Sequence, residues 1–272
     1  MGTAVTSMRS TAAPRVKIAY GERNSQFGHL HLPTPPPVAA GDDPTPVPVV
    51  VMVHGGYWST DFELVVQTPV ANDLAARGAI VWNVEYRRVG EPDGGWPRTG
   101  YDVVNAIRAL DGPVRSALPA ALAARADFGR VSLIGHSAGG QLALWAAARL
   151  QARTDRSTIT TVVVQAPASD LVRAGTNGHA ALAAFIGADY AATPHRYRDA
   201  SPAHLSPFPA HVAVVQGELD TSVPPEMSMA YVEGARRAGQ SVELVTVSGE
   251  GHDSFMDPAS RCHRETLRRL GI

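Results

Sequence analysis

The feature that most constrains the fold of this chain is an alternation of short β-branched runs with longer helical patterns. The run "VPVVVMVH" at residues 47–54 has almost no polar positions, which is typical of a strand covered on both faces. Comparable runs follow, separated by helical spacing, at residues 79–86, 130–135, 160–167, 211–217 and 242–247. Strands that alternate with helices predict a parallel sheet with helices on both of its faces.

Two further runs near the N-terminus, residues 15–21 and 27–33, are joined by a polar turn and predict an antiparallel pair at the sheet edge. The fold class is therefore α/β, with a mostly parallel eight-stranded sheet. We expect residues 1–14 to be a flexible lead-in and residues 15–272 to form a single domain, because no internal repeat is visible. Residues 170–210 are too long for a plain crossover and predict a short lid or a pocket wall.

Composition excludes several classes of protein. With a formal net charge of −1, no basic footprint points to nucleic acid. The single cysteine, Cys262, cannot form an internal disulfide and suits a reducing compartment. No apolar run is long enough to span a bilayer, and no secretory signal is evident. We therefore expect a cytoplasmic protein without a membrane or nucleic-acid partner.

The sequence "GHSAG" at residues 135–139 matches the pattern G-x-S-x-G and lies between a predicted strand and a predicted helix. A turn of this kind forces Ser137 into strained backbone angles, and its small neighbours let strand and helix approach closely. The hydroxyl is then held at the positive end of the helix, where developing negative charge is stabilised. The alternative is a glycine-rich turn in which Ser137 only caps the helix.

A serine hydroxyl is a poor nucleophile unless a base takes its proton and a carboxylate orients that base. Asp220 follows the strand at 211–217, and His252 follows the strand at 242–247 in the loop "SGEGHDSF". Since the carboxyl ends of parallel strands meet at one edge of a sheet, we expect these residues to lie close together. The pattern predicts Ser137 as nucleophile, Asp220 as acid and His252 as base.

Other carboxylates compete with Asp220 for this role. Glu218 is two residues away, and Asp170 follows the preceding strand, so either could replace it. Asp253 adjoins the base and is expected to point away from it. The remaining histidines form no metal-ligand cluster, so neither a metal nor another cofactor is expected, and Cys262 has no plausible base beside it.

The sequence "HGGYW" at residues 54–58 directly follows the buried strand at 47–54. Its glycines let main-chain N–H groups turn toward a reacting oxygen, so we expect an oxyanion hole formed by the N–H groups of Gly56, Tyr57 and Ala138. His54 is expected to support this loop through hydrogen bonds. The alternative is an ordinary Gly–Gly turn. The predicted substrate pocket consists of Trp58, His54, Trp96 and Phe185.

From "VPVVVMVHGGYW" through "GHSAGGQLAL" and "GELDTSVP" to "GEGHDSF", the chain resembles the α/β-hydrolase superfamily over nearly its whole length. The stretch "HGGYW" resembles the H-G-G-x-W signature of kynurenine formamidases and is close to the H-G-G-G loop of hormone-sensitive-lipase-type esterases. Tyr57 replaces the third glycine of that loop, and "EYRR" at residues 85–88 stands where those esterases have "DYR". These departures favour the formamidase-like and small-esterase branch.

This resemblance implies cofactor-free hydrolysis of a small ester or an activated amide through an acyl-enzyme on Ser137, as in a carboxylesterase or an arylformamidase. One alternative is acyl transfer or elimination in a biosynthetic pathway on the same scaffold. Another is a non-catalytic ligand-binding module, which would not need Ser137, Asp220 and His252 together. The turn at residues 90–95 and the segment at residues 170–210 could shape the pocket or a contact in a homodimer.

Overall fold

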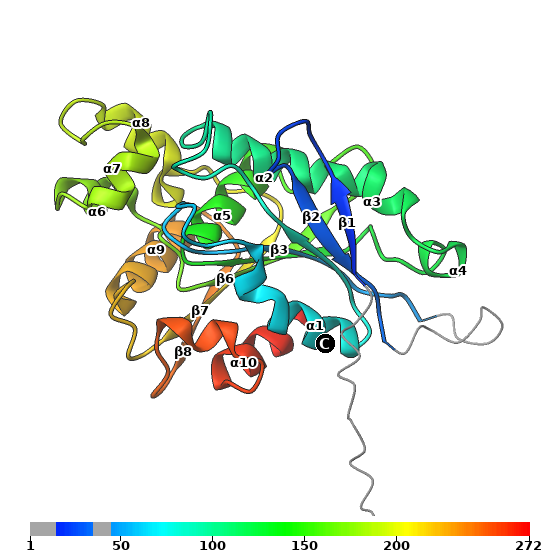
Figure 1. The fold of residues 1–272 in the computed structure, drawn as a ribbon. Coiled ribbons are helices and arrows are strands. Elements are labelled where there is room, and N and C mark those ends of the chain that lie inside the picture. The colour runs from blue at the N-terminus through cyan, green and yellow to red at the C-terminus, as the bar shows by residue number, and fades with distance from the viewer. Residues whose placement is uncertain (1–14, 35–44) are drawn as a thin grey trace, which may run out of the picture.

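A computed structural model describes residues 15–34 and 45–272 of the chain (Figure 1). Its eight strands form one sheet in the order β1-β2-β4-β3-β5-β6-β7-β8. β1 and β2 pair antiparallel, β2 pairs antiparallel with β4, and all other neighbours are parallel. The strands are β1 (Arg15–Ala19), β2 (Phe27–His31), β3 (Val49–Val53), β4 (Ile80–Val84), β5 (Val131–His136), β6 (Ile159–Gln165), β7 (His211–Gly217) and β8 (Val242–Val247). The predicted fold class is confirmed; the predicted lead-in, residues 1–14, lies outside the described residues.

Helices cover both faces of this sheet, as predicted. In Figure 1, α2, α3 and α5 lie above the sheet, and α1 and α10 lie below it. The α-helices are α1 (Thr68–Ala76), α2 (Arg98–Arg108), α3 (Pro113–Ser116), α4 (Ala120–Ala123), α5 (Ala138–Leu150), α6 (Leu171–Thr176), α7 (Ala180–Ile186), α8 (Pro194–Ala200), α9 (Pro225–Arg237) and α10 (Arg261–Leu270). Short 3₁₀ turns are η1 (Leu64–Gln67), η2 (Ala109–Asp111), η3 (Pro202–His204) and η4 (His252–Met256).

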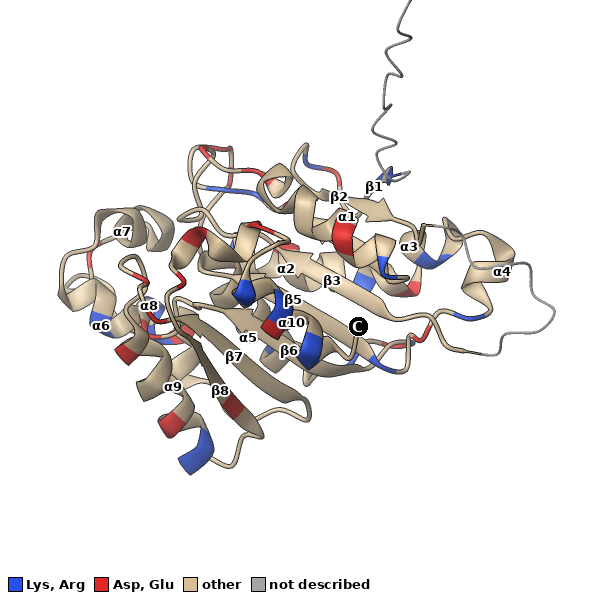
Figure 2. Cartoon of the chain, turned by 90° about the horizontal axis from the view of Figure 1, so that it is seen from below, with Lys and Arg blue, Asp and Glu red and all other residues tan. Residues whose placement is uncertain are grey.

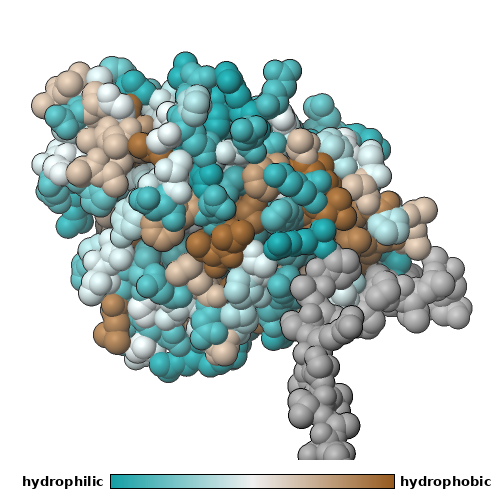
Figure 3. Space-filling model, in the orientation of Figure 1, coloured by the Kyte–Doolittle hydropathy of each residue, from teal (hydrophilic) through white to brown (hydrophobic). Residues whose placement is uncertain are grey.

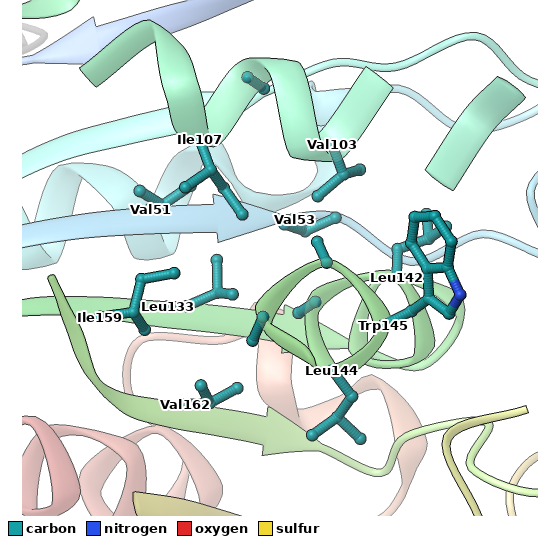
Figure 4. Close-up of a cluster of buried hydrophobic side chains, with 14 of the residues drawn as sticks. Val51, Val53, Val103, Ile107, Leu133, Leu142, Leu144, Trp145, Ile159 and Val162 are labelled. Atoms are coloured by element: carbon teal, nitrogen blue, oxygen red, sulfur yellow. The ribbon is translucent and has the colours of Figure 1, made fainter. Parts of the chain in front are cut away.

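The two faces of the sheet follow from the two-residue period of its strands. On one face, Val51 and Val53 of β3 pack in a cluster with Val103 of α2 and Leu142 of α5, as Figure 4 shows. On the other face, Val50 and Met52 pack with residues of α1 and α10. Every residue of β3 is buried, which explains its continuous apolar sequence.

The order of the strands positions the functional loops. The chain moves from β3 outward to β4, then returns to place β5 on the other side of β3. At such a reversal the loops that follow the two central strands diverge and leave a crevice at the carboxyl edge of the sheet. The "HGGYW" loop follows β3 and the "GHSAG" turn follows β5, so both lie at this crevice.

The face of the molecule in Figure 3 is largely polar with scattered apolar areas. Large apolar side chains that stay exposed include Val16 on β1, and Phe62 and Val65, which follow the "HGGYW" loop. Among the helices of residues 15–34 and 45–272, none is both long enough and apolar enough to cross a membrane.

Candidate active site

Ser137 occupies a strained turn between β5 and α5. Its backbone angles are φ 54° and ψ −117°, a region that costs a residue with a side chain about 1–3 kcal/mol. The turn is held from both sides, because the Ser137 N–H donates to the Gln165 carbonyl (2.8 Å) and the Ser137 carbonyl accepts from the N–H groups of Gly140 (3.0 Å) and Ala168 (3.2 Å). Neighbouring backbone therefore maintains a conformation that the serine alone would avoid.

Three glycines allow the backbone around Ser137 to pack closely. A Cβ atom added at Gly135 would lie 2.4 Å from the Gly139 carbonyl oxygen, and one at Gly139 would lie 2.2 Å from the Val53 carbonyl oxygen. A Cβ atom at Gly55 would lie 3.1 Å from Cβ of Ser137. The "HGGYW" loop is therefore in direct contact with the "GHSAG" turn.

The predicted acid and base form a hydrogen-bonded pair. Nδ1 of His252 lies 2.7 Å from Oδ2 of Asp220, and Oδ1 of Asp220 accepts from the N–H groups of Ser222 (2.9 Å) and Val223 (2.8 Å). Burial alone would raise the pKa of Asp220, but the hydrogen bonds from His252, Val223 and Ser222 outweigh it and lower that pKa. An ionised Asp220 keeps the proton of His252 on Nδ1, which leaves a lone pair on Nε2 to accept a proton.

Gln216, which the sequence analysis did not single out, also contacts this pair. It is fully buried at the end of β7, its Nε2 donates to Oδ2 of Asp220 (3.3 Å), and its Oε1 accepts from the Ser228 hydroxyl (2.6 Å). Gln216 therefore donates to the carboxylate oxygen that faces His252, whereas the Ser222 and Val223 amides hold the other oxygen. The available signal was a glutamine within the otherwise apolar run "HVAVVQG".

His136, also missed, is the residue directly before Ser137, and its side chain contacts the His252 loop. Its ring centroid lies 4.6 Å from that of His252, and its Nε2 lies 3.1 Å from the His252 carbonyl oxygen. Burial, together with the nearby His252 ring, lowers the pKa of His136 to about 3, so the ring is neutral at pH 7. Because a carbonyl only accepts, Nε2 of His136 carries the proton in this bond. No local pattern predicts this contact, which joins residues far apart in the chain.

The competing carboxylates have other partners. Glu218 accepts from the Ser248 hydroxyl (2.6 Å) and the Gly249 N–H (3.0 Å). Asp170 caps α6 by accepting from the Arg173 N–H (3.0 Å). Asp253 is exposed. Of the carboxylates weighed from the sequence, Asp220 is the one that the structure brings to His252.

The "HGGYW" loop has an unusual run of positive φ angles. Gly56, Tyr57 and Trp58 have φ values of 114°, 54° and 56°, which only the glycine adopts without strain. Within the described part of the chain, the N–H groups of Gly56, Tyr57 and Ala138 donate to no protein acceptor. Ala138 is the first residue of α5, so its N–H has no acceptor within the helix. These three amides remain predictions for the oxyanion hole, and the geometry leaves them available.

A buried network supports the start of this loop. Nε2 of His54 lies 2.8 Å from Oε1 of Glu85, and the His54 carbonyl accepts from the Tyr86 hydroxyl (2.7 Å). The rings of His54 and Tyr86 stack with centroids 4.3 Å apart. Burial alone would raise the pKa of Glu85, but the hydrogen bond from His54 and the nearby Arg88 lower it. Glu85, the first residue of "EYRR", therefore anchors His54, the first residue of "HGGYW".

A small cavity of about 70 Å³ lies beside Ser137. Helices α6 and α7 form one wall of it, so part of the segment at residues 170–210 borders the pocket. The sequence analysis did not identify the individual residues of this wall, because it could not tell which faces of α6 and α7 point inward. Besides Ser137 and Ala138, the lining residues are Tyr57, Trp58, Ala168, Asp170, Leu171, Ala174, His179, Leu182, Ser222, Val223 and Met227.

The predicted pocket needs correction at three positions, although Trp58 does line the cavity. His54 is buried beneath the loop against Glu85 instead. Phe185 lies behind Trp58, with the two rings stacked at 4.4 Å, and Trp96 packs edge-on against Phe185 at 5.8 Å. Phe185 and Trp96 therefore form a layer behind the pocket wall and do not line the pocket.

Across residues 15–34 and 45–272, no group of three or more His, Cys, Asp or Glu side chains is placed to hold a metal ion. Cys262 is buried, and burial raises the pKa of its thiol to about 12. A thiol of that kind is protonated at neutral pH and is a poor nucleophile.

Comparison with solved structures agrees with the α/β-hydrolase fold. A truncated carbohydrate esterase from gut microbiota superposes with a TM-score of 0.74 at 18% identity, covering 96% of both chains. Esterase B from Lactobacillus rhamnosis, inhibited with a C4-C4 SN3 tributyrin phosphonate, has a TM-score of 0.74 at 16% identity, covering 96% of this chain and 86% of that chain. Esterase 2 from Thermogutta terrifontis, phosphoramylated by tabun, has a TM-score of 0.67 at 20% identity, covering 93% and 91%.

Sequence comparison places the chain in a family. Residues 39–233 match the BD-FAE family, and the chain belongs to it. The matched range includes the "HGGYW" loop, Ser137 and Asp220, and it ends before His252. A search of curated proteins finds no match to this sequence.

Proposed function

We propose that this protein is a serine esterase that hydrolyses small carboxylic esters through an acyl-enzyme on Ser137. The observation that carries the proposal is the Asp220–His252 hydrogen bond (2.7 Å) at the edge of the sheet where Ser137 occupies its strained turn. The structurally similar proteins named above are esterases, and the one phosphoramylated by tabun reacts as serine hydrolases do.

The proposed reaction has two halves. Nε2 of His252 takes the Ser137 proton as Oγ bonds to the acyl carbon, and the same proton then passes to the departing alcohol oxygen. Water next attacks the acyl-enzyme while His252 accepts its proton, and the acid leaves as Oγ regains a proton from His252. Asp220 orients the imidazole and stabilises its charged form. The N–H groups of Gly56, Tyr57 and Ala138 stabilise the oxyanion, each contributing about 3 kcal/mol.

The small cavity favours a short acyl group. Trp58, Leu171 and Leu182 enclose it with apolar side chains, and about 70 Å³ leaves little room for a long chain. The carboxylate of Asp170 lies on the same wall, so an anionic acyl group would be repelled. Short, uncharged esters are therefore the preferred substrates.

A second candidate is hydrolysis of an aryl formamide, as in arylformamidases. Two observations favour it: the "HGGYW" sequence, and the aromatic wall that Tyr57 and Trp58 provide for an aryl leaving group. Formyl, the smallest acyl group, fits the cavity. The proposed roles of Ser137, Asp220 and His252 are the same for both substrates.

Labelling with a fluorophosphonate probe tests the nucleophile. We expect one label per chain in the wild type and none in Ser137→Ala, with circular dichroism showing that both proteins are folded. Absence of labelling in the folded wild type would favour a non-catalytic binding module.

A substrate series tests the specificity. We expect kcat/KM to fall from p-nitrophenyl acetate to the octanoate, and product analysis to show free acid, not an acyl group transferred to a second alcohol. If kcat/KM is higher for N-formylkynurenine than for every ester in the series, the protein is an arylformamidase and the esterase proposal is wrong.

A further inference from the structure

A second, larger hollow lies on the outer side of α5, where it meets α2 and α8. Its volume is about 820 Å³, within the range of sites that hold small organic ligands. It shares no lining residue with the cavity beside Ser137. Its walls include Trp96, Tyr101, Trp145, Arg149, Arg196 and Arg198.

Positive charge gathers at this hollow. Three arginines line it, against the single carboxylate of Asp199, and the imidazoles of His195 and His204 lie there as well. Among the described residues, none of these three guanidinium groups forms an ion pair. An anion entering the hollow would therefore meet cationic groups whose charge no protein carboxylate already neutralises.

The arginines of α10 provide a contrast. Arg268 and Arg269 each form ion pairs with glutamates, and Figure 2 shows acidic and basic residues together on this helix. Two arginines of the hollow are instead held by neutral groups: Arg149 donates to the Tyr101 hydroxyl (3.0 Å), and Arg196 donates to the Trp96 carbonyl. Their side chains are thus oriented, while their charge stays available to a ligand.

Aromatic rings form the rest of the site. Tyr101 is 40% exposed, whereas Trp96 and Trp145 are over 90% buried and pack edge-on with centroids 4.8 Å apart. Trp145 in turn packs edge-on against Tyr101 at 5.4 Å. The buried indoles form a rigid floor, and the Tyr101 ring offers an accessible surface for a planar ligand.

We propose that this hollow binds a small aromatic carboxylate. The carboxylate is held by Arg149 and Arg198, whose planar forks match its two oxygens, and the ligand ring packs against Tyr101. This binding needs no reaction at Ser137, so the proposal does not depend on the proposed function.

A continuous line of rings connects the hollow to the wall of the Ser137 cavity. Trp96 contacts Phe185, and Phe185 stacks on Trp58.

Trp96 and Trp145 line the hollow, so occupation of the site should change their fluorescence. The fourth tryptophan, Trp82, lies in the core with its Nε1 bonded to the Ala106 carbonyl.

Calorimetric titration of the full chain with benzoate, alongside tryptophan fluorescence, tests the proposal. We expect binding with a fluorescence change, and about tenfold weaker binding in Arg149→Gln and in Arg198→Gln. The matched control is Arg173→Gln, which removes an exposed guanidinium on α6 near the Ser137 cavity and should leave the affinity unchanged.

Three results would overturn the proposal. Equal affinity of the wild type and both hollow variants would show that the arginines do not hold the ligand. Weaker binding in Arg173→Gln alone would place benzoate at α6, outside the hollow. Equal affinity for benzoate and inorganic phosphate would exclude the contribution of the ring at Tyr101. Benzamide, the uncharged analogue, should bind at least tenfold more weakly than benzoate.

Discussion

Replacing Asp220 by Asn removes one charge and changes one atom of the predicted Asp220–His252 pair. The amide oxygen of Asn can still accept the N–H groups of Ser222 and Val223, which now hold Oδ1 of Asp220 at 2.9 and 2.8 Å. The amide NH₂ then faces Nδ1 of His252, where Oδ2 now lies at 2.7 Å. Two donors cannot share a hydrogen bond, so the imidazole proton moves to Nε2, and the ring can no longer accept the Ser137 proton.

An imidazole fixed in the wrong tautomer lowers kcat by about 10⁴, which corresponds to about 5.5 kcal/mol in the barrier. The fold should survive, because Asn keeps the size of the side chain and its contacts with the two backbone amides. Initial rates with p-nitrophenyl acetate measure the loss, and circular dichroism confirms folding. Binding of a non-hydrolysable ester analogue should change little, since Asp220 does not line the cavity.

The matched control is Glu218→Gln. Glu218 lies two residues from Asp220 but contacts Ser248 and Gly249, so its replacement should leave kcat near the wild-type value. A folded Asp220→Asn protein with kcat within tenfold of the wild type would refute the reasoning. A loss in Glu218→Gln as large as that in Asp220→Asn would transfer the acid role to Glu218.

His136→Phe keeps a ring against His252 but removes the hydrogen bond to the His252 carbonyl, so kcat should fall about tenfold at nearly constant KM. His136→Gln retains a hydrogen-bond donor and should recover part of this loss. Equal kcat values for the two variants would contradict the role of His136. Burial lowers the pKa of His31 from 6.5 to about 4, so between these values the proton binds mainly to the unfolded chain. The free energy of unfolding should therefore fall by about 1.5 kcal/mol from pH 6.5 to 5, and by less in His31→Leu. Identical pH slopes of the two proteins in urea unfolding would exclude His31 as a source. Leu182→Phe narrows the Ser137 cavity and should lower kcat/KM for the butyrate ester at least tenfold more than for the acetate ester. Equal losses of kcat/KM for the two esters would show that the acyl group binds elsewhere.

The strands were more predictable than the helices. Six of the eight predicted runs contain the corresponding strand, and the other two miss one residue at an end, because continuous burial leaves a strong local signal of β-branched residues. The helical spacing between the runs at 47–54 and 79–86 predicts a helix, but this segment forms the 3₁₀ turn η1 first, and α1 begins only at Thr68, next to Pro69. Pro69 has no N–H to donate to a carbonyl of the preceding turn, so it is tolerated in the first turn of an α-helix but not further along, and α1 begins there.

The positions of Ser137, Asp220 and His252 could be inferred because each follows a strand whose carboxyl end lies at the same edge of a parallel sheet. The pocket wall could not be inferred in the same way. Whether Phe185 lines the cavity or stacks behind Trp58 depends on the orientation of α7 relative to α5, which no local pattern encodes. The contact between His136 and His252 likewise arises from tertiary packing.

Mass spectrometry of the acyl-enzyme tests the central claim most directly. The protein is mixed with p-nitrophenyl acetate, quenched in acid within milliseconds and digested. The account predicts one acetyl group on the peptide that contains Ser137, and neither that adduct nor turnover in a folded Ser137→Ala protein. Undiminished turnover in Ser137→Ala, or acetylation of another residue at the rate of turnover, would contradict it.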